Sequence, residues 1–167
     1  MSFLNYHHFP VYSIMVLFLG AFLIVLFGKN KFMRNLIAFL PVAASLACIV
    51  ALVKPVMLDG EIIAYWMGNR AVAGGYAIGI ALEVDALSLF FALLISTAVF
   101  VSGVYSLQYM EHDNNVPEYY TLFLMLAGGV MGLVLSGDIF NMFIMVEILT
   151  FAAVALTAFR NQVFGAL

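Results

Sequence analysis

The chain has 167 residues, of which 66% are hydrophobic and 9% are charged. Soluble domains carry about 25% charged and 45–50% apolar residues, so this composition excludes an ordinary soluble globule and favours the lipid bilayer as solvent. Six Lys and Arg residues and a net charge of −3 argue against a nucleic-acid partner. The single cysteine, Cys48, excludes a disulfide framework, and no motif for a cofactor or a metal ion is present.

Five stretches are long and apolar enough for transmembrane helices, which need about 17–25 such residues. We expect an all-α membrane protein with one membrane domain over residues 1–167 and helices at about 11–28, 35–53, 86–107, 119–136 and 139–159. The second helix is expected to stop at Lys54-Pro55, because proline cannot continue it, and the fifth at Arg160-Asn161. The first is interpreted as a retained helix, since no Lys or Arg precedes it.

The connection between the second and third helices is too long for a simple turn. Apolar residues alternate with small or polar ones over residues 77–84, which is typical of a strand. Residues 61–66 form a second candidate strand, and Gly68, Gly74 and Gly75 lie between the two. We therefore expect a small external β-hairpin here.

The basic residues indicate an orientation. Lys29, Lys31 and Arg34 lie between the first two helices, and the positive-inside rule places them in the cytoplasm. The N-terminus is then outside the cell and, after five crossings, the C-terminus is cytoplasmic. We expect a multi-pass protein of the plasma membrane.

Glu147 is the acid that falls well inside a predicted span, about 12 Å from the nearer helix end. An acid near the bilayer centre costs on the order of 3 kcal/mol and is tolerated when it faces protein or water. A dry surround disfavours the charged carboxylate, which is the condition for reversible proton uptake near neutral pH. The residues that share its face are Phe140, Phe143, Ile144, Thr150, Phe151 and Val154. Proton or ion transfer is indicated; the alternatives are a permanently protonated acid and one paired with a base on another subunit.

Three polar residues near helix ends are candidates for a supporting role. Asp138 precedes the fifth helix and Asp85 the third, where an acid can cap free N–H groups and stabilise the helix dipole. A share in ion entry is the alternative for Asp138. Asn141, one turn into the fifth helix, is expected to hydrogen-bond to a neighbouring helix.

Small residues recur on the fourth predicted helix. Gly128, Gly132 and Ser136 are spaced four residues apart, which lets two membrane helices approach closely. We expect this stripe to pack the fourth helix against the fifth and so to bury the region around Glu147.

The string that contains these residues resembles a known signature. Residues 136–143 read SGDIFNMF and precede Glu147, which resembles the GDLFN…E signature of Mrp-type cation/proton antiporter subunits, above all those of the D type. These subunits are related to the antiporter-like subunits of respiratory complex I and of membrane-bound hydrogenases. Residues 65–68, 79–88 and 119–135 also resemble family segments, so the likeness covers nearly all of the chain. Val146 departs from the pattern, because relatives often carry an aromatic residue there.

The resemblance implies a fold of about fourteen helices, with two inverted five-helix repeats after three leading helices. This chain would supply the first five. It also implies that Glu147 handles protons, in the family together with a lysine on a broken seventh helix, which would lie beyond Leu167.

We therefore expect a subunit of a multi-subunit membrane complex that translocates protons and Na⁺ or another monovalent cation. Other membrane subunits would be its partners, including a chain that supplies the missing antiporter helices, and any electron transfer would belong to them. The alternatives are a non-conducting assembly module and an independent transporter formed by homo-oligomerisation.

Overall fold

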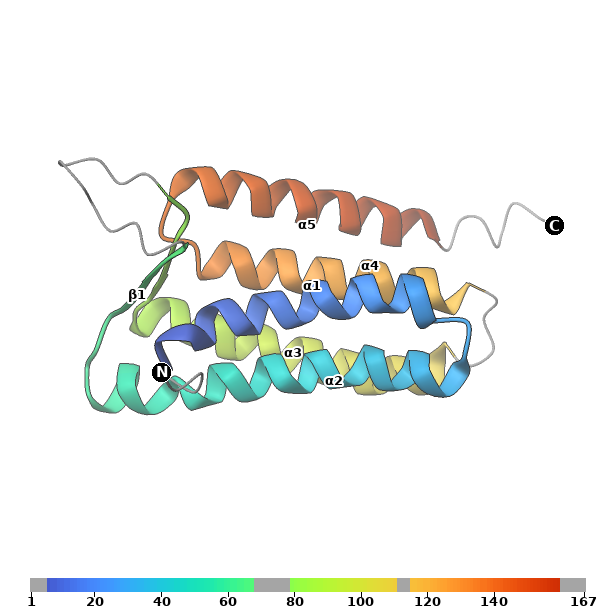
Figure 1. The fold of residues 1–167 in the computed structure, drawn as a ribbon, viewed down its shortest axis with the longest axis horizontal. Coiled ribbons are helices and arrows are strands. Elements are labelled where there is room, and N and C mark those ends of the chain that lie inside the picture. Colours follow the sequence, from blue (N-terminus) through green and yellow to red (C-terminus); the bar gives the residue numbers. More distant parts are fainter. Residues whose placement is uncertain (1–5, 68–78, 111–114, 160–167) are drawn as a thin grey trace.

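The computed structural model describes residues 6–67, 79–110 and 115–159, which form a bundle of long helices with a hairpin at one end (Figure 1). Five of these helices are long and apolar enough to cross a membrane, which confirms the expected architecture. The helices are α1 (Phe9–Phe27), α2 (Lys31–Ala51), α3 (Ala86–Tyr109), α4 (Val116–Val134) and α5 (Ile139–Phe159). The expected stop of α5 at Arg160-Asn161 lies outside the described residues.

The start of α2 lies four residues before the predicted one. The side-chain oxygen of Asn30 accepts a hydrogen bond from the backbone N–H of Phe32 at 3.0 Å and caps the helix. Lys31 and Arg34 therefore belong to the first turn of α2, where long basic side chains can reach the membrane surface.

Helix α2 ends at Ala51, before Lys54-Pro55 as expected, but the proline does not end the helical path of the chain. The chain continues past α2 into a π-helical turn, η2 (Lys54–Leu58), with Pro55 near its start. Proline is tolerated there because the first turn of a helical segment does not use its N–H. The turn is closed by a hydrogen bond from Asp59 N–H to the carbonyl of Lys54 at 3.2 Å, the wider spacing of a π-helix.

The hydrophobic core lies among α1, α2, α3 and α4. Helix α1 packs against α2 and α4, and α3 packs against the same two helices. At the α1–α2 contact a Cβ on Gly20 would lie 2.5 Å from Cγ of Pro41 and 3.1 Å from Cδ1 of Leu124. Only a glycine therefore allows the backbones of α1 and α2 to come this close.

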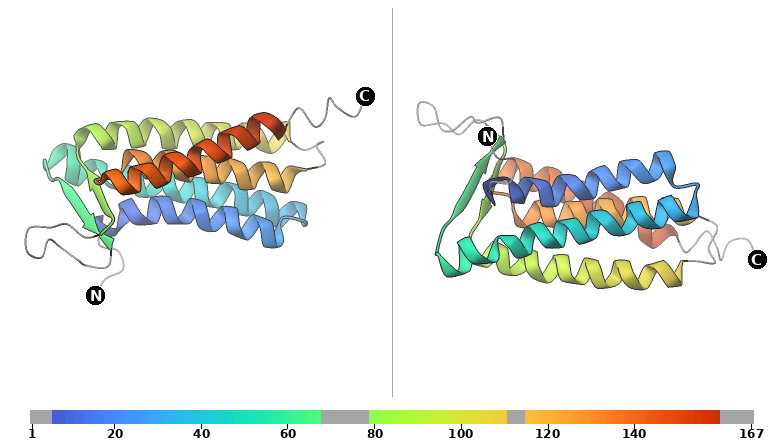
Figure 2. Two further views of the ribbon diagram at one scale, coloured as in Figure 1. Left: turned by 90° about the horizontal axis from the view of Figure 1, so that it is seen from above. Right: turned by 60° about the horizontal axis from the view of Figure 1, so that its bottom comes forward.

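Helix α5 lies at the edge of the bundle. It packs mainly on α4 and crosses the other helices obliquely, as Figure 2 shows. Only 6% of the apolar 18-residue stretch that qualifies α5 as a membrane span is buried, against 50% of the corresponding stretch of α4. One side of α5 is therefore left uncovered by the described part of the chain.

The expected hairpin is confirmed. Strands β1 (Ile63–Trp66) and β2 (Ala81–Val84) pair antiparallel, with Ile63 opposite Val84 and Trp66 opposite Ala81. Both are shorter than the predicted strands, and the connection expected to carry Gly68, Gly74 and Gly75 lies outside the described residues. The hairpin, the start of α1 and the α4–α5 connection lie at the same end of the bundle (Figure 1).

Candidate functional site

Asp138 holds the start of α5 at the hairpin end of the bundle. Its Oδ1 accepts a hydrogen bond from the backbone N–H of Asn141 at 2.7 Å, which caps the helix as the sequence predicts. Its Oδ2 accepts from the backbone N–H of Ala81 in β2 at 2.9 Å. One carboxylate thus joins the first turn of α5 to the hairpin.

The backbone on either side of Asp138 also pairs with β2. The N–H of Glu83 donates to the carbonyl of Leu135 at 2.9 Å, and that of Gly137 donates to the carbonyl of Ala81 at 2.8 Å. A Cβ on Gly137 would lie 3.2 Å from Cβ of Glu83, so this approach requires a small residue. Strand β2 is therefore paired on both edges, once with β1 and once with the α4–α5 connection.

Asn141 is buried, with 2% of its surface exposed. Its Nδ2 donates to Oγ of Ser136 at 2.6 Å, and that hydroxyl donates to the carbonyl of Gly132 at 2.7 Å. The partner of Asn141 thus lies just beyond the end of α4, and the two bonds join the facing ends of α4 and α5.

A small cavity of about 80 Å³ adjoins Asn141 between α1, the hairpin and α5. It is apolar apart from the Asn141 amide. Its lining residues are Val11, Ile14, Met15, Met67, Ile80, Leu82, Asn141 and Met145.

The small residues of α4 pack against two neighbouring helices, α1 and α5. A Cβ on Gly128 would lie 2.9 Å from Cε1 of Phe18 on α1, whereas one on Gly132 would overlap the side chain of Met145 on α5. Gly129, beside the predicted stripe, has the backbone nitrogen of Leu149 3.1 Å from its notional Cβ. The seam between α4 and α5 is therefore made by Gly129 and Gly132, while Gly128 faces α1.

The structure corrects the expectation that this packing buries Glu147. The residues of α5 that face the bundle are Asn141, Met145, Leu149 and Ala152. At about 100° per residue, Glu147 is some 160° away from both Met145 and Leu149 around the helix, and it is exposed. Within the part of the chain that the structure describes, its carboxyl has no hydrogen-bonded or ion-paired partner.

The neighbours of Glu147 on this outward face are also uncovered. Phe143 is 63% exposed and Phe151 73% exposed. The hydroxyl of Thr150 donates to the carbonyl of Val146 at 2.7 Å, within the same helix. The predicted grouping of residues on one face therefore holds, but that face points away from the bundle. Sequence spacing can group side chains on a face but says nothing of what covers it.

Asp85 caps α3 through a reciprocal pair of bonds. Its Oδ1 accepts from the backbone N–H of Ser88 at 2.7 Å, and the Ser88 hydroxyl accepts from the backbone N–H of Asp85 at 2.8 Å. The pKa of Asp85 is lowered, first by the hydrogen bond that its carboxylate accepts from the Ser88 backbone N–H and then by its interaction with the Ser88 side chain. Unlike Asp138, Asp85 has its side-chain bonds within the first turn of its own helix.

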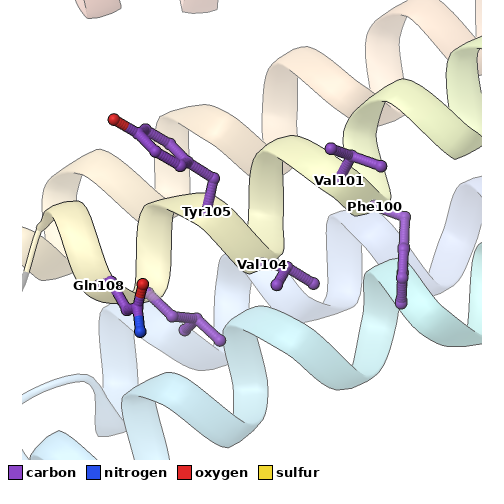
Figure 3. Close-up of a pocket in the computed structure, with 6 residues that line it drawn as sticks. Phe100, Val101, Val104, Tyr105 and Gln108 are labelled. Carbon is purple, nitrogen blue, oxygen red and sulfur yellow. The ribbon is translucent and has the colours of Figure 1, made fainter.

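Two shallow grooves of about 610 and 740 Å³ run along the outer surface of α3 and are lined by residues of that helix alone. Figure 3 shows the first, with Phe100, Val101, Val104, Tyr105 and Gln108 around it. Both are predominantly apolar. Among the described residues no three His, Cys, Asp or Glu side chains are grouped to hold a metal ion.

Known proteins with the same arrangement are membrane subunits. Residues 71–120 match the family model described as NADH-ubiquinone oxidoreductase (complex I), chain 5 N-terminus. The N-type subunit of NADH-quinone oxidoreductase from Rubrobacter xylanophilus is 34% identical over 89 residues, 53% of this chain and 17% of that protein. The D-type subunit of a Na(+)/H(+) antiporter from Alkalihalophilus pseudofirmus is 25% identical over 143 residues, 86% of this chain and 28% of that protein. The chain is thus similar to parts of subunits of such complexes.

Solved structures agree with this relationship. The chain superposes on a chain of the membrane-bound sulfane sulfur reductase, an archaeal respiratory membrane complex, with a TM-score of 0.79 and 25% identity over 89% of its length. It also has the fold of a chain of the Mrp complex from Dietzia sp. DQ12-45-1b, with a TM-score of 0.76 and 22% identity over 88% of its length. It spans 30% and 26% of those two chains. The chain is thus a multi-pass membrane protein with the fold of part of these two chains.

The contacts of β2 with the α4–α5 connection were not predicted. Ala81 and Leu135 take part through backbone groups, which leave no side-chain signal in the sequence. Gly137, which stands next to Asp138 in the motif, was the one residue that could have pointed to this close approach.

Proposed function

We propose that this chain is a subunit of a multi-subunit membrane complex that translocates protons and Na⁺ or another monovalent cation, with Glu147 as a proton-exchanging group. The observation that carries the proposal is the position of Glu147 within an apolar membrane-spanning helix, where this acid is exposed and its carboxyl has no partner among the described residues. A carboxyl group there costs several kcal/mol if it faces lipid, so acids in such segments generally face protein or a water-filled path.

The outward face of α5 supports a second element of the proposal, which is a covering partner. Further antiporter-type helices would pack on this face and bring a polar or basic group, or a water path, to Glu147. Its apolar residues, such as Phe143 and Phe151, suit contact with another membrane helix. Other membrane subunits of the complex would supply these helices and carry any electron transfer.

The names of the relatives support the class of substrate. One is a Na(+)/H(+) antiporter subunit and another a K(+)/H(+) antiporter subunit. A glutamate that gains and loses a proton as a neighbouring charge moves provides the coupling that exchange of a cation for a proton requires.

The proposed orientation of the chain in the membrane follows from the basic residues at one end of the bundle. Lys29, Lys31 and Arg34 gather at the turn between α1 and α2, which we place in the cytoplasm of a cell bounded by its plasma membrane. The hairpin and the start of α5 then lie outside, and the end of α5 lies inside.

Replacement of Glu147 by glutamine tests the proposal, because glutamine keeps the size of the side chain but cannot release a proton. The assembled complex is reconstituted into vesicles, and cation-dependent proton movement is followed with a pH-sensitive dye. We expect Glu147→Gln to abolish this movement without lowering the amount of complex. Glu118→Gln is the matched control, because Glu118 is an exposed acid in the first turn of α4. Unchanged proton movement in Glu147→Gln would refute the role of Glu147.

A non-conducting assembly subunit is the second candidate, favoured by the mainly apolar character of the outward face of α5. In that case Glu147→Gln leaves transport intact. Bulky replacements such as Gly128→Leu and Gly132→Leu, which would collide with Phe18 and Met145, instead reduce the amount of assembled complex. Quantifying the intact complex on native gels separates the two candidates.

A further inference from the structure

The start of α5 is bonded to the rest of the protein more closely than the remainder of the helix. Asp138 accepts from Ala81, Gly137 pairs with the same residue of β2, and Asn141 donates to Ser136. Beyond this first turn, α5 contacts α4 through side chains such as Met145 and through the close approach of Gly129 to Leu149. Hydrogen bonds are directional, so those at the start of α5 constrain its depth and rotation in addition to the packing at Gly129 and Gly132.

We propose that Asp138 is a positioning residue for Glu147. By accepting from Asn141 and Ala81 at once, its carboxylate fixes the rotation and the depth of α5 relative to the hairpin. This inference rests on the proposed function, because it assigns Asp138 an effect on the proton-exchanging group.

The chemistry of the site requires a carboxylate. Its two oxygens accept from two N–H groups on different elements, whereas an amide has a single oxygen acceptor. Asparagine is as good a helix cap as aspartate, so it can keep the bond to Asn141 and lose the one to Ala81. The N–H and the carbonyl of Ala81 both point toward the α4–α5 connection, and β1 pairs along the other edge of β2.

The hydrogen bonds of Asp138 can affect the position of Glu147 because Asp138 caps the helix that carries Glu147. Glu147 is nine positions after Asp138, which corresponds to about 13.5 Å along the helix axis and about two and a half turns. A rotation of α5 by one residue would turn Glu147 by about 100°, from the outward face toward the edge of the α4 seam. The bonds at Asp138 therefore act on Glu147 through a single rigid helix.

A double-mutant cycle in the assembled, reconstituted complex tests the proposal. Asp138→Asn removes the acceptor for Ala81, and replacing Ala81 by its α-hydroxy analogue, lactic acid, turns the donor N–H into an ester oxygen without adding bulk at the edge that faces Asp138. A hydrogen bond to a charged acceptor is worth at least about tenfold in an equilibrium constant, so we expect each variant to lower the transport rate per assembled complex about tenfold. The double variant should be no slower than the slower single one, because both changes break the same bond.

A spectroscopic measurement reports on the position of α5 independently of transport. Spin labels are attached at Phe32→Cys, in the first turn of α2, and at Thr157→Cys, near the end of α5, in a Cys48→Ala background. We expect the distance distribution between them to shift or broaden in Asp138→Asn and in the variant with an ester at position 81. Ser88→Ala is the control, because it removes a first-turn hydrogen bond of α3 that joins no other element; it should leave both distance and transport unchanged.

Each outcome decides one of the two proposals. The positioning role is overturned if the double variant loses as much transport as the two single variants together. It is also overturned if the distance between the spin labels is unchanged in Asp138→Asn. Losses of transport that only follow the amount of assembled complex overturn it as well. If Glu147→Gln conducts normally, the proposed function fails instead, and a shifted label distance still establishes that Asp138 positions α5.

Discussion

The seam between α4 and α5 allows a quantitative prediction at Gly129. In Gly129→Ala the new Cβ would lie 3.1, 3.2 and 3.3 Å from N, Cα and Cβ of Leu149. Favourable contacts between carbon atoms lie at about 3.5–4.0 Å, so α5 must move outward by about 0.5 Å at this level. Two of the three atoms are backbone atoms, and no change of rotamer relieves the overlap.

The magnitude follows from two opposing effects. Overpacking costs about 1–3 kcal/mol, whereas glycine to alanine in a helix gains about 1 kcal/mol. We expect Gly129→Ala to lower the free energy of unfolding by up to about 2 kcal/mol. Gly103→Ala is the matched variant on α3, where the new Cβ would lie 3.8 Å from Phe123 and 3.9 Å from Val42. Having room, it should stabilise the protein by up to about 1 kcal/mol.

The assay is reversible unfolding of the purified protein in mixed micelles with increasing sodium dodecyl sulfate, monitored by circular dichroism. The ordering of the two variants matters more than either value, because both have the same chemical change. If Gly129→Ala is as stable as Gly103→Ala, the contact between α4 and α5 is looser than described and the reasoning is refuted.

Two further predictions concern α1 and α3. Gly20→Ala should destabilise the protein by up to about 2 kcal/mol, since the ring of Pro41 cannot rotate away from the new Cβ and the gain in helix propensity offsets only about 1 kcal/mol of the overpacking. A thermal melting midpoint equal to that of the wild type would contradict this. The pKa of Asp85 is lowered in the folded state, so its stabilising effect is full above the ordinary aspartate value of about 3.9 and is lost as the pH falls through the lowered value. The difference in melting temperature between wild type and Asp85→Asn should therefore shrink below about pH 4, and a difference independent of pH would disprove this account.

Much of the fold could be predicted from the hydropathy of the sequence and from the chemistry of residues at helix ends. The five spans follow from apolar length, and the caps at Asp85 and Asp138 follow from the preference of acids for helix starts. The observed helix boundaries differ from the predicted ones where residues expected to lie outside the helix are part of a helical turn. Lys31 and Arg34 fit into the first turn of α2, and Pro55 fits near the start of a π-helical turn.

The candidate site was less accessible to sequence reasoning, because it depends on contacts across the chain. Glu147 and its neighbours were correctly grouped on one face, yet a periodic pattern does not say which face of α5 meets α4. That choice is made by Gly129 and Gly132, which admit Leu149 and Met145 and so turn Glu147 outward. The link from Asp138 to Ala81 spans 57 positions and uses a backbone donor, which no residue pattern announces.

The edge position of α5 bears on how the protein is built in the membrane. Helices α1 to α4 share a core whose fully buried residues include none from α5, so these four can consolidate as soon as α4 has been inserted. Strand β2 meanwhile keeps an open edge until residues 135–137 follow α4 and pair with it. Helix α5 thus joins a scaffold formed by the other four helices, and the connection that precedes it completes the pairing of β2. Glu147 would then enter the bilayer on a helix at the edge of this scaffold, with its outward side free to receive a neighbouring helix.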